Sequence, residues 1–133
     1  MSPARPHIRH GFGAVRPCLY GHADLPDFVR EVFEAAELGR TAHRHGGCNV
    51  EMRVDDAVLV LETAPPSGWQ DGKPRGVVCV YVRDTDAAYA RALRRGAGVL
   101  MEPQDRPWGD RVAGVADPFG NTWWIATHAH RCV

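Results

Sequence analysis

The chain has 133 residues, 44% of them hydrophobic, and its 16 basic and 16 acidic side chains give a formal net charge of zero. This length supports one domain with a substantial core. The balanced charge, without basic or acidic blocks, argues against nucleic acid or an anionic membrane surface as a partner. No apolar run approaches the roughly 20 residues of a membrane-spanning helix. Four scattered cysteines without a Cys-x-x-Cys pair indicate reduced thiols in a cytoplasmic protein.

The first half of the chain predicts a strand, a helix and three further strands. The first strand is expected over 15–20. Asp24 offers an N-cap oxygen and Pro26 fits the first turn of the helix. Apolar side chains then recur at helical spacing, and Gly39 is expected to end the helix. Further strands are expected over 40–45, 48–54 and 57–63, the last two as a hairpin.

The second half repeats this order of elements. A helix is expected to begin at Asp84 or Thr85 and to end at Gly96. The strands are expected over 77–82, 99–102, 111–116 and 122–127, and the sequence Asp-Pro-Phe-Gly-Asn over 117–121 predicts a tight turn before the last one. The repeat is weak in residue identity and clear in element order. Neither half alone buries both faces of a four-stranded sheet, so we expect the halves to share a core or a cavity.

Adjacent tryptophans mark the last predicted strand. Successive side chains of a strand point to opposite faces of its sheet. One of Trp123 and Trp124 is therefore expected to join the core, while the other lines whatever space the sheet curves around.

Three segments carry a resemblance to a known family: VEMRVDDAVLVLE (50–62), YVRDTDAAYARALRRGAGVLMEP (81–103) and WGDRVAGVADPFGNTWWIATH (108–128). Here the chain resembles the vicinal oxygen chelate superfamily of glyoxalases, bleomycin-resistance proteins and extradiol dioxygenases, and more closely its small PhnB-like or bleomycin-resistance-like members. The resemblance implies an α+β fold in which two tandem βαβββ modules form a curved open sheet around a central cleft. It also implies a homodimer, with strand exchange between chains in some members.

The expected organisation follows from the repeat and the resemblance together. A segment rich in proline and glycine separates the two halves and predicts a connector. The expected parts are a flexible N-terminal tail (1–13), a first module (14–64), the connector (65–76), a second module (77–128) and a C-terminal tail (129–133). The polar N-terminal tail lacks the apolar region of a secretory signal.

The resemblance also bears on metal binding. Catalytic members hold a divalent metal with His or Glu from the first and last strands of each module. The corresponding positions lie near Pro17, Glu62, Val77 and Trp124, with Cys18 as a second candidate ligand if the register shifts. Only Glu62 is a suitable ligand, and one carboxylate does not hold a hard divalent ion. We therefore expect no metal and no cofactor, and we place Trp124 in the cleft and Trp123 in the core.

A cleft without a metal is expected to bind a small molecule directly. Trp108 lies in a Pro-Trp-Gly loop and Trp69 in the connector, and tryptophans in such places suit flat aromatic ligands. The candidate ligand-binding residues are Trp108, Trp124, Trp69, Tyr81, Glu62, Asn49, Glu51 and Cys79. Two alternatives stay open: Glu62 is either a cleft carboxylate or a solvated strand end, and Trp69 contacts either the ligand or a dimer partner.

Three functions compete at this point. The first is a metal-independent protein that sequesters a hydrophobic aromatic compound such as an antibiotic, with no catalytic residue, as bleomycin-resistance-like proteins do. The alternative is a metal-dependent lyase, isomerase or dioxygenase of the same superfamily with relocated ligands. Its ligands would come from His43, His45, Glu51, Glu62 and His128. A third is a regulatory module whose cleft is filled by its own side chains.

Overall fold

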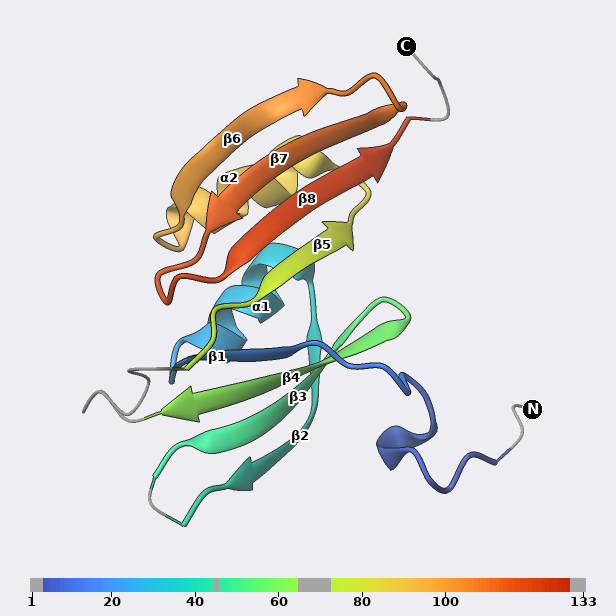
Figure 1. Ribbon diagram of the computed structural model, residues 1–133, viewed down its shortest axis with the longest axis vertical. Helices are drawn as coiled ribbons and strands as arrows, with labels where there is room; N and C mark the ends of the chain where they lie inside the picture. Colours follow the sequence, from blue (N-terminus) through green and yellow to red (C-terminus); the bar gives the residue numbers. More distant parts are fainter. Residues whose placement is uncertain (1–3, 45, 65–72, 130–133) are drawn as a thin grey trace.

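The computed structural model describes residues 4–44, 46–64 and 73–129. In chain order (Figure 1) its elements are η1 (Arg9–Gly11), β1 (Cys18–His22), α1 (Leu25–Phe33), β2 (Ala36–Ala42), β3 (Cys48–Val54), β4 (Ala57–Ala64), β5 (Val77–Tyr81), α2 (Thr85–Arg94), β6 (Gly98–Asp105), β7 (Asp110–Ala116) and β8 (Thr122–His128). The predicted hairpin of β3 and β4 is present, and every other predicted strand has a counterpart, with ends shifted by up to four residues.

The strands form two four-stranded sheets of the same topology, β1-β4-β3-β2 and β5-β8-β7-β6. In each sheet the first strand of the module runs parallel to the last one, and the other neighbours are antiparallel. Each sheet and its helix make one βαβββ module. Figure 1 shows both helices between the two open sheets. The predicted α+β fold of tandem βαβββ modules is confirmed.

The two modules share one hydrophobic core. The helices pack against each other, and buried side chains from both helices and both sheets form a single cluster. Trp123 is fully buried in this cluster, as predicted. Its ring centroid lies 4.9 Å from that of Phe33 and 6.2 Å from that of Phe28. The last strand of the second module is therefore packed on the helix of the first.

The first helix ends earlier than its sequence pattern indicates. It stops at Phe33 because Glu34 adopts a left-handed conformation with φ 55°, and the chain then enters β2. Gly39, which was predicted to end the helix, lies within β2, and the strand predicted over 40–45 occupies 36–42. A left-handed residue that ends a helix is most often glycine. A glutamate in this position gives no recognisable signal in the sequence.

The two helices begin differently. Asp24 occupies the N-cap position of α1, but its side chain makes no capping hydrogen bond, contrary to prediction. The side chain of Asp84 does cap α2, because its Oδ1 accepts from the backbone N–H of Ala87 at 3.1 Å. Gly96 follows α2 with φ 89°, as a helix-ending glycine should. Within the described residues no helix is long and apolar enough to cross a membrane.

The predicted turn between β7 and β8 connects three segments of the chain. The Asp117 carboxylate accepts from the backbone N–H groups of Phe119 and Asn121, each at 2.9 Å. The Asn121 side chain donates to the carbonyl of Tyr20 at 3.0 Å and accepts from the N–H of Gly76 at 2.8 Å. This one side chain therefore holds the end of β1, the connector and the turn together.

Candidate ligand-binding site

The outer face of the second sheet carries a pocket of about 380 Å³. Because Trp123 turns toward the helices, the strand alternation turns Trp124 and Ala126 to the outer face. Cys79 of β5 pairs with Trp124, and Tyr81 with Ala126. The pocket is lined by Cys79, Tyr81, Met101, Arg106, Trp108, Asp110, Val112, Trp124 and Ala126.

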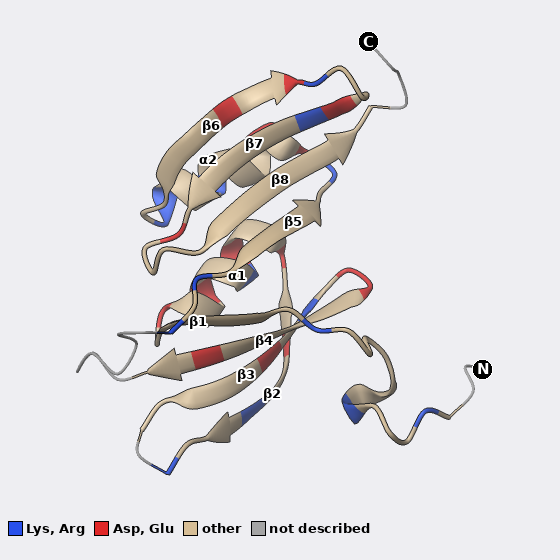
Figure 2. Cartoon of the chain, viewed as in Figure 1, with Lys and Arg blue, Asp and Glu red and all other residues tan. Residues whose placement is uncertain are grey.

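The floor of this pocket is uncharged. Figure 2 shows no Lys, Arg, Asp or Glu on β5 or β8. The indole of Trp124 lies against the backbone of its neighbour in β7, because a Cβ on Gly114 would lie 2.4 Å from the ring. Glycine at position 114 therefore lets the ring lie flat on the sheet. Any side chain there would displace the ring into the pocket.

The loop between β6 and β7 places a second tryptophan at the rim. The loop is closed by hydrogen bonds from Arg106 N to Asp110 O at 2.7 Å and from Gly109 N to Arg106 O at 3.0 Å, and Gly109 adopts φ 94°. Trp108 is 55% exposed, and the guanidinium of Arg106 lies 5.1 Å from its ring centroid. The rim thus presents an aromatic ring with a cation on one face.

A buried carboxylate fixes the polar side of the pocket. Asp110 is 5% exposed and accepts three hydrogen bonds or ion contacts from neighbouring side chains. They come from the Tyr81 hydroxyl at 2.5 Å, from Trp108 Nε1 at 3.2 Å, and from His128 Nδ1 at 2.9 Å. The bonds from Tyr81 and then His128 hold the pKa of Asp110 below its ordinary value. Asp110 thus remains ionised and positions the aromatic side chains around it.

We expect Tyr81 to ionise at a higher pH than an ordinary tyrosine. Its hydroxyl donates to the Asp110 carboxylate, and this hydrogen bond, together with the adjacent negative charge, raises the pKa of Tyr81. An absorbance titration of tyrosinate resolves this, because the chain has only three tyrosines and Tyr81→Phe identifies the signal. Asp110→Asn should move the Tyr81 titration to lower pH. An unchanged titration curve in Asp110→Asn would contradict the proposed hydrogen bond.

Cys79 contributes as an uncharged side chain. Burial, followed by the charge of Asp110, raises the pKa of its thiol above the ordinary value. The thiol therefore stays protonated at neutral pH, where it is a poor nucleophile. Its place beside Trp124 makes it part of the apolar lining.

Asn49 and Glu62 lie on the outer face of the first sheet, away from this pocket. They are a directly opposed pair of β3 and β4, and Glu62 also neighbours Tyr20 of β1. Both are half-buried, and Asn49 Oδ1 is buried without a hydrogen-bond partner among the described residues. Neither is among the residues that line the pocket of the second sheet.

Glu51 is held by the N-terminal segment, which was predicted to be a flexible tail. The side chain of Glu51 is 8% exposed, and its carboxylate contacts three basic groups. Arg16 Nη1 lies 2.7 Å from Oε2, while Arg9 Nε and His10 Nε2 lie 2.9 and 3.2 Å from Oε1. Both carboxylate oxygens are therefore engaged within the chain. The same segment brings Gly13 against Val58, the fully buried residue opposite Arg53 on this face.

The candidate residues thus separate into groups. The second sheet brings together Cys79, Tyr81, Trp108 and Trp124 in one pocket. The first sheet holds Asn49, Glu51 and Glu62, and Trp69 lies outside the described residues. Five lining residues were missed, namely Met101, Arg106, Asp110, Val112 and Ala126. Alternation along β7 could have indicated Asp110 and Val112, since both share the face of Gly114.

The side chains at the positions implied for metal ligands do not fit a metal. Val77 and Trp124 carry no donor atom for a divalent ion, and Pro17 has no polar side-chain atom. In the part of the chain that the structure describes, no three His, Cys, Asp or Glu side chains lie close enough together to hold an ion. His128, one of the possible relocated ligands, contacts Asp110. His45, another of them, lies outside the described residues.

Comparisons with known proteins agree with this architecture. The family model of the Glyoxalase/Bleomycin resistance protein/Dioxygenase superfamily matches residues 23–125. The uncharacterized protein Rv0887c of Mycobacterium tuberculosis is 33% identical over 124 residues, which span 82% of this chain and 73% of that protein. The crystal structure of TioX from Micromonospora sp. ML1 is 22% identical, with a TM-score of 0.67 over 88% of this chain and 98% of that one. The fosfomycin resistance protein FosX from Listeria monocytogenes is 12% identical, with a TM-score of 0.65 over 88% and 92%. The last two likenesses concern the fold alone.

Proposed function

The chain belongs to the Glyoxalase/Bleomycin resistance protein/Dioxygenase superfamily, and we propose that it captures a hydrophobic, aromatic small molecule in the pocket on its second sheet. The proposed activity is stoichiometric binding, as in a protein that protects a cell against a compound such as an antibiotic. The proposal assigns no catalytic residue, metal or cofactor. It places the chain in the cytoplasm, in keeping with the free thiols of Cys18, Cys48 and Cys79.

The observation that carries this proposal is the gathering of three aromatic side chains around one pocket. Trp124 supplies the floor, Trp108 the rim and Tyr81 a side, and Met101 and Val112 add apolar surface. The volume of about 380 Å³ falls within the roughly 300–1,000 Å³ of small-molecule sites. Rings stacked on tryptophan or packed against its edge gain interaction beyond the burial of apolar area.

The polar groups of the pocket favour a ligand with few hydrogen-bonding atoms. The oxygens of Asp110 already accept from three side chains, so the carboxylate is a weak site for a ligand donor. The guanidinium of Arg106 donates to Gln104 Oε1 at 2.8 Å through one nitrogen and keeps further N–H groups at the rim. An aromatic compound with an acceptor or anionic group at one end matches this distribution.

The comparisons support the choice of an antibiotic as the class of ligand. The family description includes bleomycin resistance proteins, and one of the structural neighbours is a fosfomycin resistance protein. Those descriptions belong to the other proteins. For this chain, they make drug-like compounds the first ligands to test.

The proposal includes a homodimer. β1 and β5 each form an edge of their sheet in the described chain, and an unpaired edge is a ready site for another strand. β5 also exposes apolar surface, because Val77 is 69% and Tyr81 59% exposed. Association of two copies along these edges would cover it. Sedimentation equilibrium of the purified chain, which separates monomer from dimer by mass, tests this part.

Replacing either pocket tryptophan should weaken ligand binding. Trp108→Ala and Trp124→Ala are each expected to cost about 1–3 kcal/mol of binding free energy, as aromatic hot-spot residues do. Calorimetric titration with a panel of polycyclic aromatic antibiotics measures the change. Trp69→Ala is a further variant, which shows whether the connector tryptophan contributes. If Trp108→Ala and Trp124→Ala bind as tightly as the parent, the site lies elsewhere.

Elemental analysis separates this proposal from the metal-dependent alternative. The protein should be purified without chelator and its content of first-row transition metals measured. The capture proposal expects no metal in stoichiometric amount. One equivalent of tightly held metal would instead favour an enzyme of the same superfamily.

A further inference from the structure

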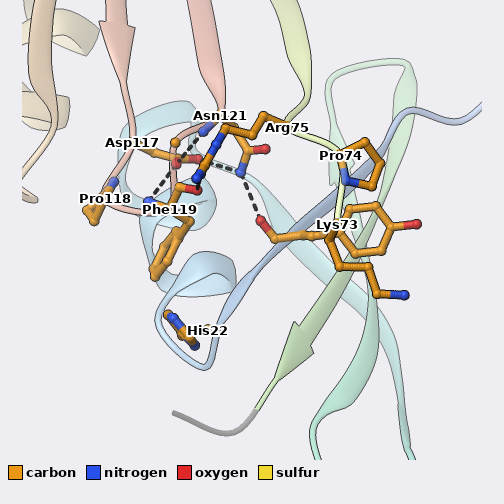
Figure 3. Close-up of a pocket in the computed structure, with 10 residues that line it drawn as sticks. His22, Lys73, Pro74, Arg75, Asp117, Pro118, Phe119 and Asn121 are labelled. Atoms are coloured by element: carbon orange, nitrogen blue, oxygen red, sulfur yellow. Dashed lines mark hydrogen bonds between the residues drawn. The ribbon is translucent and has the colours of Figure 1, made fainter. Parts of the chain in front are cut away.

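We propose that a second pocket, at the junction of the two modules, binds a small molecule through an anionic group such as a phosphate or a carboxylate. This pocket has a volume of about 630 Å³. Its walls come from the end of β1, from connector residues 73–75 and from the turn over 117–121. None of its lining residues belongs to the pocket on the second sheet. Figure 3 shows these three segments around it.

The lining of the pocket is positively charged. Lys73 and Arg75 of the connector both line it, with His22 of β1. Asp117 is the one acidic residue of the lining, and it is 4% exposed. Its carboxylate accepts four N–H groups: the backbone of Phe119 and of Asn121, the Asn121 side chain, and the indole of Trp123. The negative charge of Asp117 is thus committed to the turn and the core, and the two cations face the pocket without an acidic counterpart in its lining.

Arg75 is fixed in place by the turn. Its Nη1 donates to the carbonyl of Phe119 at 2.5 Å. The guanidinium lies directly over Gly120, where a Cβ would be 2.0 Å from Nη1. The described residues offer no acceptor to Nε or Nη2, so these donors remain for a ligand. A planar guanidinium held in one orientation is well suited to bind phosphate or carboxylate oxygens.

Aromatic rings support the remaining basic side chains. The ammonium of Lys73 lies 5.2 Å from the ring centroid of Tyr20, and the ring of His22 meets that of Phe119 edge-on at 5.6 Å. Figure 3 shows His22 below Phe119 and Lys73 on the opposite side of the hollow. The pocket therefore combines cationic and aromatic walls. Its volume also leaves room for more than the anionic group itself.

The frame of this pocket is tied together independently of any ligand. Asn121 bonds both to Tyr20 of the first module and to Gly76 at the end of the connector. An anion seated between Lys73 and Arg75 would contact the connector while resting on both modules. We therefore expect binding to raise the thermal stability of the whole chain by mass action.

Inorganic phosphate is the first probe, titrated into the full chain against sodium chloride of equal ionic strength, with acetate in a parallel arm. Saturable binding of phosphate or acetate is expected, and the stronger of the two identifies the class of anion. Lys73→Gln and Arg75→Gln should each weaken it about tenfold or more, the loss of one charge-assisted hydrogen bond. Arg94→Gln, which removes an exposed cation from α2, is the matched control and should change nothing.

The controls separate a built site from general charge attraction. An equal loss in Arg94→Gln, or the absence of saturable binding of either anion to the parent chain, would overturn the proposal. Arg75→Gln also removes the bond to Phe119, so the melting temperature of each variant is measured without anion, and Lys73→Gln alone must show the loss. Trp108→Ala should bind the anion as the parent does, which keeps this test independent of the aromatic pocket.

Discussion

Replacing Trp123 by alanine is expected to lower the free energy of unfolding by about 3–5 kcal/mol, the usual cost of deleting a buried aromatic side chain. Trp123 is fully buried between Phe28 and Phe33 of α1, so the change opens a cavity where the two modules meet. It also leaves Asp117 without its indole donor. Urea unfolding followed by circular dichroism measures the loss.

Two further variants make this result interpretable. Trp123→Phe keeps a ring in the core but removes the donor at 2.8 Å from Asp117, and should cost about 1–3 kcal/mol. Trp108→Phe alters a tryptophan that is 55% exposed and should stay within about 0.5 kcal/mol of the parent. Equal effects at positions 123 and 108 would show that the shared core is not centred on Trp123.

Replacing Glu51 by alanine is expected to cost about 3 kcal/mol, because removing one partner of a buried ion pair leaves the other uncompensated. The estimate is at the lower end of such losses since Arg16 is 16% exposed and keeps backbone acceptors at Gly13 and Phe12. Losing the carboxylate should also release the N-terminal segment from β3. Trypsin cleavage after Arg9, followed by mass spectrometry, should become faster than in the parent.

Glu37→Ala is the matched control for this prediction. Glu37 also pairs with an arginine, Arg40, but at the surface, where such a pair contributes about 0–1 kcal/mol. The control should leave both stability and the cleavage rate near those of the parent. If Glu51→Ala is as stable as Glu37→Ala and cleavage after Arg9 is no faster, the contact between the N-terminal segment and β3 is not formed in solution.

The sequence predicts most of this fold because its local signals agree with its long-range order. The Asp117–Asn121 turn and the β3–β4 hairpin combine turn residues with strand-forming neighbours, and both are present. The duplicated element order led to the two modules. The end of α1 could not be predicted, since it depends on Glu34 adopting a left-handed conformation that glycine normally provides.

The pocket was only partly predictable for a related reason. Strand alternation and the family resemblance were enough to place Trp124, Tyr81 and Cys79 on one face. Asp110 was missed because its importance arises from three partners far apart in type and position, which come together only after folding. Glu51 shares a sheet face with Asn49, but no pattern indicates that the N-terminal arginines reach it.

The covering of Glu51 has a consequence for ligand binding. With part of the first sheet occupied by the chain's own N-terminal segment, the open aromatic surface lies on the second sheet. The aromatic pocket and the junction pocket differ in character, since one has an uncharged floor and the other a cationic lining. A compound with an aromatic body is therefore expected to prefer the first, and a simple oxyanion the second.

The most direct measurement is an equilibrium titration of polycyclic aromatic antibiotics, followed by tryptophan fluorescence, with mass spectrometry of the ligand recovered afterwards. We expect saturable quenching at one ligand per aromatic pocket, weakened in Trp108→Ala and Trp124→Ala, and a recovered ligand of unchanged mass. A bound compound recovered in chemically altered form, or a panel that causes neither quenching nor thermal stabilisation, would contradict capture without turnover.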